Sequence, residues 1–209
     1  MRARVAGGEA FKLCAALLRY PDERLAAAGP ELAAAVAALP RGAARAALAE
    51  FLRHLDGKAT LELEQAFVET FDVSRRTSLY LTYYVHGDTR KRGVALLRLK
   101  RLYAAAGLEL VTGELPDYLP LVLEFAALAP AEGETLLQEH RPSLELLRGA
   151  LREAGSPYAL VLDAVCALLP RLGALERRRV LELAAAGPPE ERVGLEPFAP
   201  PETMPGARV

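Results

Sequence analysis

The chain has 209 residues, 52% of them apolar, and its formal net charge is −1. A chain of this length and composition can bury the core of one large domain, which excludes disorder of the whole chain. The near-neutral charge argues against a nucleic-acid binder that relies on overall charge.

The sequence also indicates where the protein resides. No apolar run approaches the roughly 18 residues that a membrane span needs, and the N-terminus lacks the apolar core of a signal peptide. Cys14 and Cys166 lie in apolar helical patterns far apart in the sequence. We therefore expect a cytoplasmic protein with two buried free thiols, and a disulfide between them is the alternative.

Apolar residues at helical spacing, punctuated by Pro and Gly, predict an all-α, single-domain bundle of about nine to ten helices. We expect the helical domain to span residues 1–187 and the Pro-rich segment 188–209 to form an extended tail. The predicted helices cover residues 9–20 with a short continuation over 22–28, then 31–39 and 43–55. A further helix begins at Thr60 and carries Leu63, Phe67 and Phe71 on its apolar side. The others cover 78–85, 88–107 and 118–129, two or three more segments between 131 and 169, and 174–186.

The segment from Ser78 to Val85 is ambiguous. Its apolar residues alternate with Tyr80, Thr82 and Tyr84, which is a strand pattern. No second strand-like run exists to pair with it, and a lone strand leaves its backbone groups without partners. We therefore predict a helix.

Tyrosines in this segment form the first candidate site. Tyr80, Tyr83 and Tyr84 could line a groove for an apolar helical peptide, because tyrosine offers a large contact area and a hydrogen-bonding tip. The alternative is that the three rings belong to the core. His86 could contact a ligand, although the following Gly87 and Asp88 are explained by a helix end and a helix start.

The helix predicted over residues 88–107 has two faces. At about 100° per residue, Arg90, Lys91, Arg98 and Arg101 fall within an arc of about 100°, opposite the apolar side. Such a face could bind phosphates, an acidic protein surface or the pyrophosphate of a cofactor. A solvated helix face is the alternative.

Acidic residues accompany the almost wholly apolar helix over residues 118–129. Asp117 is placed to cap this helix, and it shares one helical face with Leu121 and Glu124. Together with Glu114, they would suit a peptide that is apolar on one side and carries arginine on the other. The alternative is a capping aspartate and a salt-bridged glutamate.

Strong catalytic signatures are missing from the sequence. There is no GxSxG elbow, Walker loop or GxGxxG motif, and the three histidines lack HExxH or CxxC spacing. We therefore expect no catalytic residues, no metal site and no enzymatic activity.

The block FVETFDVSRRTSLYLTYYVHGDTRKRG, followed by ALLRLKRLYAAAG and ELPDYLPLVLEFAAL, resembles the NarJ family of nitrate reductase molybdenum-cofactor assembly chaperones. The resemblance is dense over residues 67–128. It implies an all-helical fold of the TorD/DmsD-like redox-enzyme maturation chaperones. The wider group carries an E-x-x-D-H motif, which here reads Glu114-Leu-Pro-Asp117-Tyr118, so the acidic pair carries over and the histidine does not.

The resemblance also implies a partner and a set of binding residues. The protein would bind the N-terminal segment of the catalytic (alpha) subunit of a respiratory nitrate reductase, with cofactor-delivery proteins as further partners. Molybdopterin guanine dinucleotide would belong to that client and not to this chain. The alternatives are a chaperone of a dimethylsulfoxide or trimethylamine N-oxide reductase, and a nucleotide-dependent factor that uses the basic helix face. The peptide-binding residues that we expect are Tyr80, Tyr83, Tyr84, His86, Glu114, Asp117, Tyr118, Leu121 and Glu124.

Overall fold

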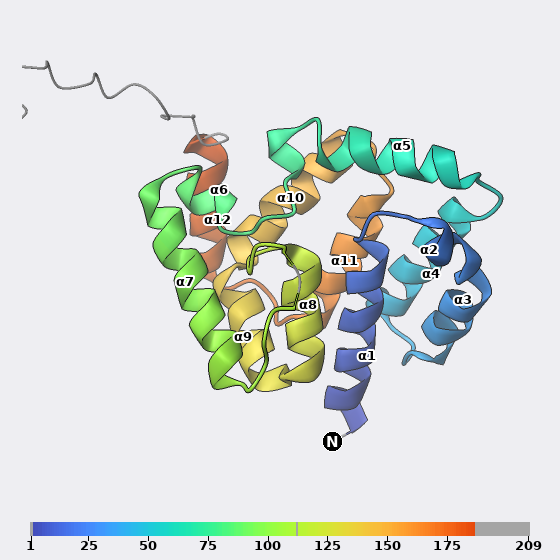
Figure 1. Cartoon of the computed structure of the whole chain (residues 1–209), viewed down its shortest axis with the longest axis horizontal. Coiled ribbons are helices and arrows are strands. Elements are labelled where there is room, and N and C mark those ends of the chain that lie inside the picture. Colours follow the sequence, from blue (N-terminus) through green and yellow to red (C-terminus); the bar gives the residue numbers. More distant parts are fainter. Residues whose placement is uncertain (1, 112, 187–209) are drawn as a thin grey trace, which may run out of the picture.

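A computed structural model describes residues 2–111 and 113–186 of the chain, and over these residues the protein is all-helical (Figure 1). They form twelve α-helices and one short 3₁₀ helix, without a strand. The predicted fold class is confirmed, with two or three more helices than the sequence indicated. The tail expected over residues 188–209 lies outside the described residues.

Most helix bounds follow the Pro and Gly punctuation of the sequence. The helices are α1 (Arg2–Leu17), α2 (Glu23–Ala27), α3 (Gly29–Ala38), α4 (Ala43–Leu55), α5 (Thr60–Phe71), η1 (Arg75–Thr77), α6 (Tyr83–His86), α7 (Arg90–Ala105), α8 (Leu119–Leu128), α9 (Pro130–Glu139), α10 (Arg141–Glu153), α11 (Tyr158–Leu168) and α12 (Ala174–Ala186).

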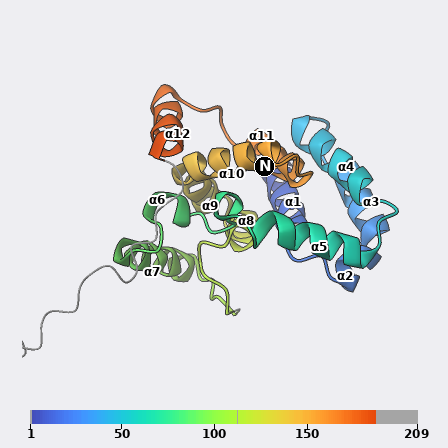
Figure 2. The ribbon, with the colours of Figure 1, turned by 90° about the horizontal axis from the view of Figure 1, so that it is seen from above.

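The core is built around α8 and α11, the two helices with the most apolar sequences. Leu119, Val122 and Leu123 of α8 and Val161 and Leu162 of α11 are completely buried. Helices α1, α9 and α10 pack around them, and α4 covers the outer side of α11 (Figures 1 and 2). Apart from Glu124 of α8 and Asp163 of α11, both helices are apolar, because other helices cover most of their surface.

One glycine sets the spacing between α8 and α9. A Cβ atom on Gly133 would lie 2.2 Å from the Cα atom of Ala126, which is well inside van der Waals contact. Gly133 is buried, so neither helix can move aside into solvent. The two helices can approach this closely only because residue 133 has no side chain.

The helix predicted over residues 78–85 is wrong. Residues 83–86 form the single turn of α6, which Gly87 ends with a φ of 54° as expected. Residues 79–82 are extended or turn-like, and Tyr80 forms an isolated antiparallel bridge with Tyr118. The alternating pattern therefore did mark a strand-like segment, with a partner too short to be recognised as a strand.

The end of the molecule that carries α7 lies far from the end that carries α3 and α4 (Figures 1 and 2). Helix α7 packs mainly on α6, and its buried residues are Leu99 and Tyr103. None of the helices in the described parts of the chain is long and apolar enough to cross a membrane.

Candidate functional site

Asp117 joins three elements at the centre of the candidate site. Its carboxylate is fully buried, and its Oδ2 atom accepts hydrogen bonds from the backbone N–H and the hydroxyl of Thr82 at 3.2 and 2.5 Å. Two backbone bonds complete the bridge: Leu81 N–H to the Asp117 carbonyl at 3.0 Å and Leu119 N–H to the Leu79 carbonyl at 2.8 Å. The extended segment 79–82 is thereby fixed against the start of α8.

The prediction that Asp117 caps α8 is therefore wrong. Tyr118 occupies the N-cap position without a side-chain cap bond, and the Asp117 side chain turns to Thr82 instead. The Oδ1 atom of Asp117 is buried without a hydrogen-bond partner among the described residues. Pro120 falls in the first turn of α8, as the sequence indicated, where its missing N–H costs nothing.

Arg92 attaches α7 to this bridge, although the sequence analysis did not select it. Its guanidinium pairs with Asp88 at 2.8 Å and lies 3.6 Å from Asp117, and its Nε atom donates to the Thr82 hydroxyl at 3.3 Å. The guanidinium also lies 5.6 and 5.7 Å from the ring centroids of Tyr80 and Tyr83, within the range of a cation–π interaction. Arg92 points inward, away from the basic face of α7.

The three tyrosines of the segment differ in what they contact. Tyr83 is buried, so it cannot line an open groove in this conformation. The Tyr84 hydroxyl lies 2.8 Å from the Ser78 carbonyl and 3.1 Å from that of Arg76, which holds the segment before α6. Burial raises the pKa of Tyr84, so the hydroxyl keeps its proton and remains a donor.

Tyr80 and Tyr118 form the accessible part of the predicted tyrosine site. Both are half-buried, and their ring centroids are 5.4 Å apart. The Tyr80 hydroxyl donates to the carboxylate of the exposed Glu114 at 3.1 Å. Burial, and next the nearby Glu114, raise the pKa of each tyrosine to about 12.

The other two residues that we predicted to share a binding face with Asp117 lie on α8. Leu121 is buried, and Glu124 pairs with Arg19 of the segment that follows α1 at 2.6 Å. The alternative prediction of a salt-bridged Glu124 is therefore confirmed, and the Leu121 side chain belongs to the core. Glu114 is thus the predicted acidic residue that is most open to solvent.

A groove of about 890 Å³ lies beside this framework, between α7 and α9, and we call it the α7–α9 groove. Leu99, Leu102 and Leu136 supply its apolar lining, and residues 82–86 form one end. Its polar lining residues are Thr82, His86, Arg98, Arg101, Glu132, Thr135, Glu139, His140 and Arg179. The volume is in the range typical of ligand pockets.

Charges of both signs meet in the α7–α9 groove. Arg98 pairs with Glu139 across it, with N–O distances of 3.0 and 3.1 Å. Arg101, Arg179 and Glu132 also line the groove, and the two arginines have no such partner among the described residues. Burial lowers the pKa of His140 at the α9–α10 junction, although the neighbouring Glu139 and Asp117 oppose the shift.

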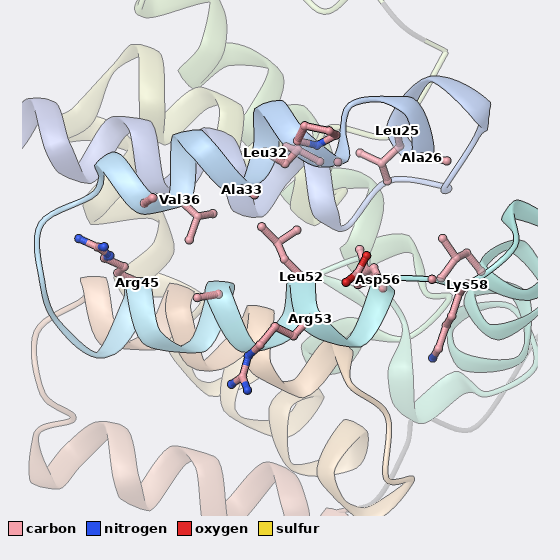
Figure 3. Close-up of a pocket in the computed structure, with 17 residues that line it drawn as sticks. Leu25, Ala26, Leu32, Ala33, Val36, Arg45, Leu52, Arg53, Asp56 and Lys58 are labelled. Atoms are coloured by element: carbon pink, nitrogen blue, oxygen red, sulfur yellow. The ribbon is translucent and has the colours of Figure 1, made fainter.

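Further cavities lie elsewhere in the described parts of the chain. One, of about 570 Å³, lies between α3 and α4, where Val36 and Leu52 point toward each other and Arg45 and Lys58 lie at opposite ends (Figure 3). Another, of about 370 Å³, lies between α10, α12 and η1. We call the first the α3–α4 groove.

The structure thus brings only part of the predicted site together. Of the predicted residues, the α7–α9 groove contains His86, Arg98 and Arg101, whereas Arg90 and Lys91 lie on the outer face of α7. Thr135, His140 and Arg179 line the groove but carried no recognisable motif. Within the described parts of the chain, no three His, Cys, Asp or Glu residues are grouped as metal ligands, and Cys14 and Cys166 are buried free thiols.

Comparisons with known proteins give consistent results. Residues 37–162 match the family described as the nitrate reductase delta subunit. The chain is 34% identical over 167 residues to a Bacillus subtilis protein named "Probable nitrate reductase molybdenum cofactor assembly chaperone NarJ", covering 79% of this chain and 91% of that protein. It is 40% identical over 156 residues to the Escherichia coli nitrate reductase molybdenum cofactor assembly chaperone NarJ, covering 73% of this chain and 66% of that protein.

Two further similarities concern a longer relative and a solved structure. The chain is 38% identical over 166 residues to the nitrate reductase-like protein NarX of Mycobacterium tuberculosis, covering 79% of this chain but only 25% of that protein. A crystal structure of a proposed redox enzyme maturation protein from Archaeoglobus fulgidus is similar with a TM-score of 0.57. That match covers 85% of this chain and 93% of the other at 23% identity, so it bears on the fold alone.

Proposed function

The chain belongs to the nitrate reductase delta subunit family, and on that premise we propose that it is an assembly chaperone for the catalytic subunit of a respiratory nitrate reductase. The observation that carries this proposal is the match to the Bacillus subtilis relative, of which it covers 91%. The role is non-catalytic and cytoplasmic, and the buried free thiols fit a reducing compartment.

We propose further that the chaperone binds the N-terminal segment of this client in the α7–α9 groove. The groove is lined by apolar side chains together with polar and charged ones, which suits a short amphipathic segment. The tyrosine segment then acts mainly through its position, because the bridge from Asp117 to Thr82 holds one end of the groove in place. Tyr80, Tyr118 and Glu114 extend the contact surface beyond that end.

The charges of the groove suggest what the client segment carries. Arg98 and Glu139 neutralise each other, which leaves Arg101, Arg179 and Glu132 in the groove lining. A segment with at least one acidic side chain would pair with the two free guanidinium groups, and a basic one with Glu132 or Glu114. The order of acidic and basic residues in the client therefore sets its orientation in the groove.

The energetic cost of ordering the client segment allows the client to be released. A client segment that becomes ordered on binding gives up about 2–5 kcal/mol of the contact energy, so the complex remains dissociable. Preferential binding of the client before it receives molybdopterin guanine dinucleotide would make cofactor insertion the release signal. Equal affinity for the loaded and the unloaded client, measured by titration calorimetry, would rule out this coupling.

The decisive experiment fills each groove in turn. Thr135→Trp places a large side chain in the α7–α9 groove, and Ala49→Trp does the same in the α3–α4 groove. Both positions are exposed, so neither change disturbs the core. We expect Thr135→Trp to weaken binding of a client N-terminal peptide about tenfold or more, and Ala49→Trp to leave it unchanged. Weaker binding by Ala49→Trp with unchanged binding by Thr135→Trp would instead place the peptide-binding site in the α3–α4 groove.

A separate experiment identifies the client. The full chain, used as bait in cells that express several molybdoenzymes, should retain the apo catalytic subunit of nitrate reductase. Retention of a dimethylsulfoxide or trimethylamine N-oxide reductase instead would assign the protein to another client.

A further inference from the structure

The outer face of α7 carries positive charges without counter-ions. Arg90, Lys91, Arg98, Lys100 and Arg101 are exposed on it, and the helix contains no acidic residue. Arg98 pairs with Glu139, but the other four side chains have no hydrogen-bond or ion-pair partner among the described residues. Like charges on one helix face repel one another, and an anionic partner would remove this repulsion.

Six arginines outside α7 are paired with carboxylates. Arg19, Arg76, Arg141, Arg148, Arg152 and Arg178 each lie within 4.0 Å of a carboxylate oxygen. Because the whole protein has a net charge of −1, the positive face of α7 is a local property and not a general surplus. What distinguishes α7 is that four positive side chains, unpaired among the described residues, share one helix that contains no acidic residue.

The arrangement of these charges on α7 suits an extended flat surface. At about 100° per residue, Arg90 and Arg101 lie at the centre of the face, Lys91 and Arg98 on one flank, and Lys100 on the other. The helix has 16 residues and is therefore about 24 Å long, and it lies at the outer end of the molecule (Figures 1 and 2). A convex face of this kind can touch a plane along its whole length.

Two aliphatic side chains lie among the charges. Val94 is 72% exposed and Leu97 is 48% exposed, and both point within about 40° of the centre of the face. The interface of a bilayer accommodates both kinds of group, because lysine and arginine meet lipid phosphates while aliphatic groups enter the acyl boundary.

We propose that the outer face of α7, defined by Arg90, Lys91, Val94, Leu97 and Lys100, docks on the surface of an anionic lipid bilayer. The contact is peripheral and reversible, since each lysine or arginine near such a surface strengthens binding only about fivefold. The α7–α9 groove runs along one flank of the same helix, where Arg98 and Arg101 line it, so a client segment bound there is held next to the membrane.

Co-sedimentation of the full chain with lipid vesicles tests this proposal. We expect binding to vesicles of equimolar phosphatidylglycerol and phosphatidylcholine, and none to vesicles of phosphatidylcholine alone. The double variant Arg90→Glu/Lys100→Glu should bind the anionic vesicles at least about 25-fold more weakly, because two attractive charges are lost. Neither residue lines the α7–α9 groove, so affinity for the client peptide should not change.

The matched control reverses two exposed charges at the other end of the molecule. Arg24→Glu/Arg41→Glu makes the same change in net charge, and it should bind the vesicles almost as well as the wild-type chain. Equal losses in both double variants would attribute binding to net charge and overturn the proposal. Retention on immobilised polyglutamate without vesicle binding would also overturn it, and would assign the face to an acidic protein.

Discussion

Replacement of Asp117 provides the most direct test of how the site is held together. The carboxylate accepts two hydrogen bonds from Thr82 and lies 3.6 Å from the guanidinium of Arg92. Hydrogen bonds to a charged group contribute about 1.5–3 kcal/mol each, and removal of one partner from a buried ion pair costs about 3–5 kcal/mol. We therefore expect Asp117→Ala to lower the free energy of unfolding by about 3–5 kcal/mol.

The conservative variant separates charge from shape. Asp117→Asn retains the volume and one acceptor oxygen, which can accept both hydrogen bonds from Thr82, while Arg92 retains its pair with Asp88. Its loss should be smaller, about 1–3 kcal/mol. Urea denaturation followed by circular dichroism gives both values. Asp56→Ala, at an exposed position, serves as the control and should change stability by less than about 0.5 kcal/mol.

Two outcomes would contradict this account of Asp117. A loss below about 1 kcal/mol for Asp117→Ala would mean that the bridge to Thr82 contributes little to stability. An asparagine variant less stable than the alanine variant would mean that the pocket around the orphan Oδ1 atom rejects an amide more strongly than it needs an acceptor.

Three further predictions concern packing and pH. Gly133→Ala should lower the free energy of unfolding by about 3 kcal/mol in thermal or urea denaturation, because the new Cβ atom would clash with Ala126. As a control, a Cβ atom on Gly149 in α10 would meet nothing within 4 Å, so Gly149→Ala should raise the free energy of unfolding by about 0.5–1 kcal/mol. Burial lowers the pKa of His140, so the stability that His140 contributes is present above its unfolded pKa of about 6.5 and is lost on acidification. His140→Gln should therefore make the free energy of unfolding depend less on pH between pH 5 and 7. Burial raises the pKa of Tyr80 and Tyr118 to about 12, so their contribution is complete below pH ~10 and is lost as the pH rises through 12. Absorbance at 295 nm should therefore show phenolate formation from these two rings only in step with alkaline unfolding, and earlier titration of both would contradict their burial.

Local sequence signals predicted the helices well because Pro and Gly mark most of their ends. The sequence predicted helices over 43–55 and 174–186, and α4 and α12 have those bounds; the predicted helix start at Thr60 is also the start of α5. These signals act over a few residues along the chain, so they survive in the folded protein.

The prediction for the segment from Leu79 to Thr82 was wrong because its structure depends on a partner far away in the sequence. Its strand-like alternation was recognised, but we rejected it because no second strand was visible in the sequence. The partner is the start of α8, where Tyr118 and its neighbours pair with it through two backbone hydrogen bonds. A pairing this short, between residues 80 and 118, leaves no periodic signal in either segment.

The candidate site shows the same limit. The helical wheel separated Arg92 from Arg90, Lys91, Arg98 and Arg101, which was the available hint that Arg92 points inward. The groove itself depends on residues of α6, α7, α9 and α12 that meet only after folding. Thr135 and Arg179 therefore have no signature that a single sequence reveals.

The close contact of Gly133 with Ala126 has a consequence for the range of clients. It locks one wall of the groove, α9, onto the core at a distance that no larger residue permits. The opposite wall, α7, is held by α6, by the contacts of Arg92 with Thr82 and Asp117, and by Tyr103, whose ring packs on Phe125 of α8. In the proposed binding mode, the groove adapts to larger or smaller client segments through the tilt and side chains of α7, while α9 stays fixed against α8.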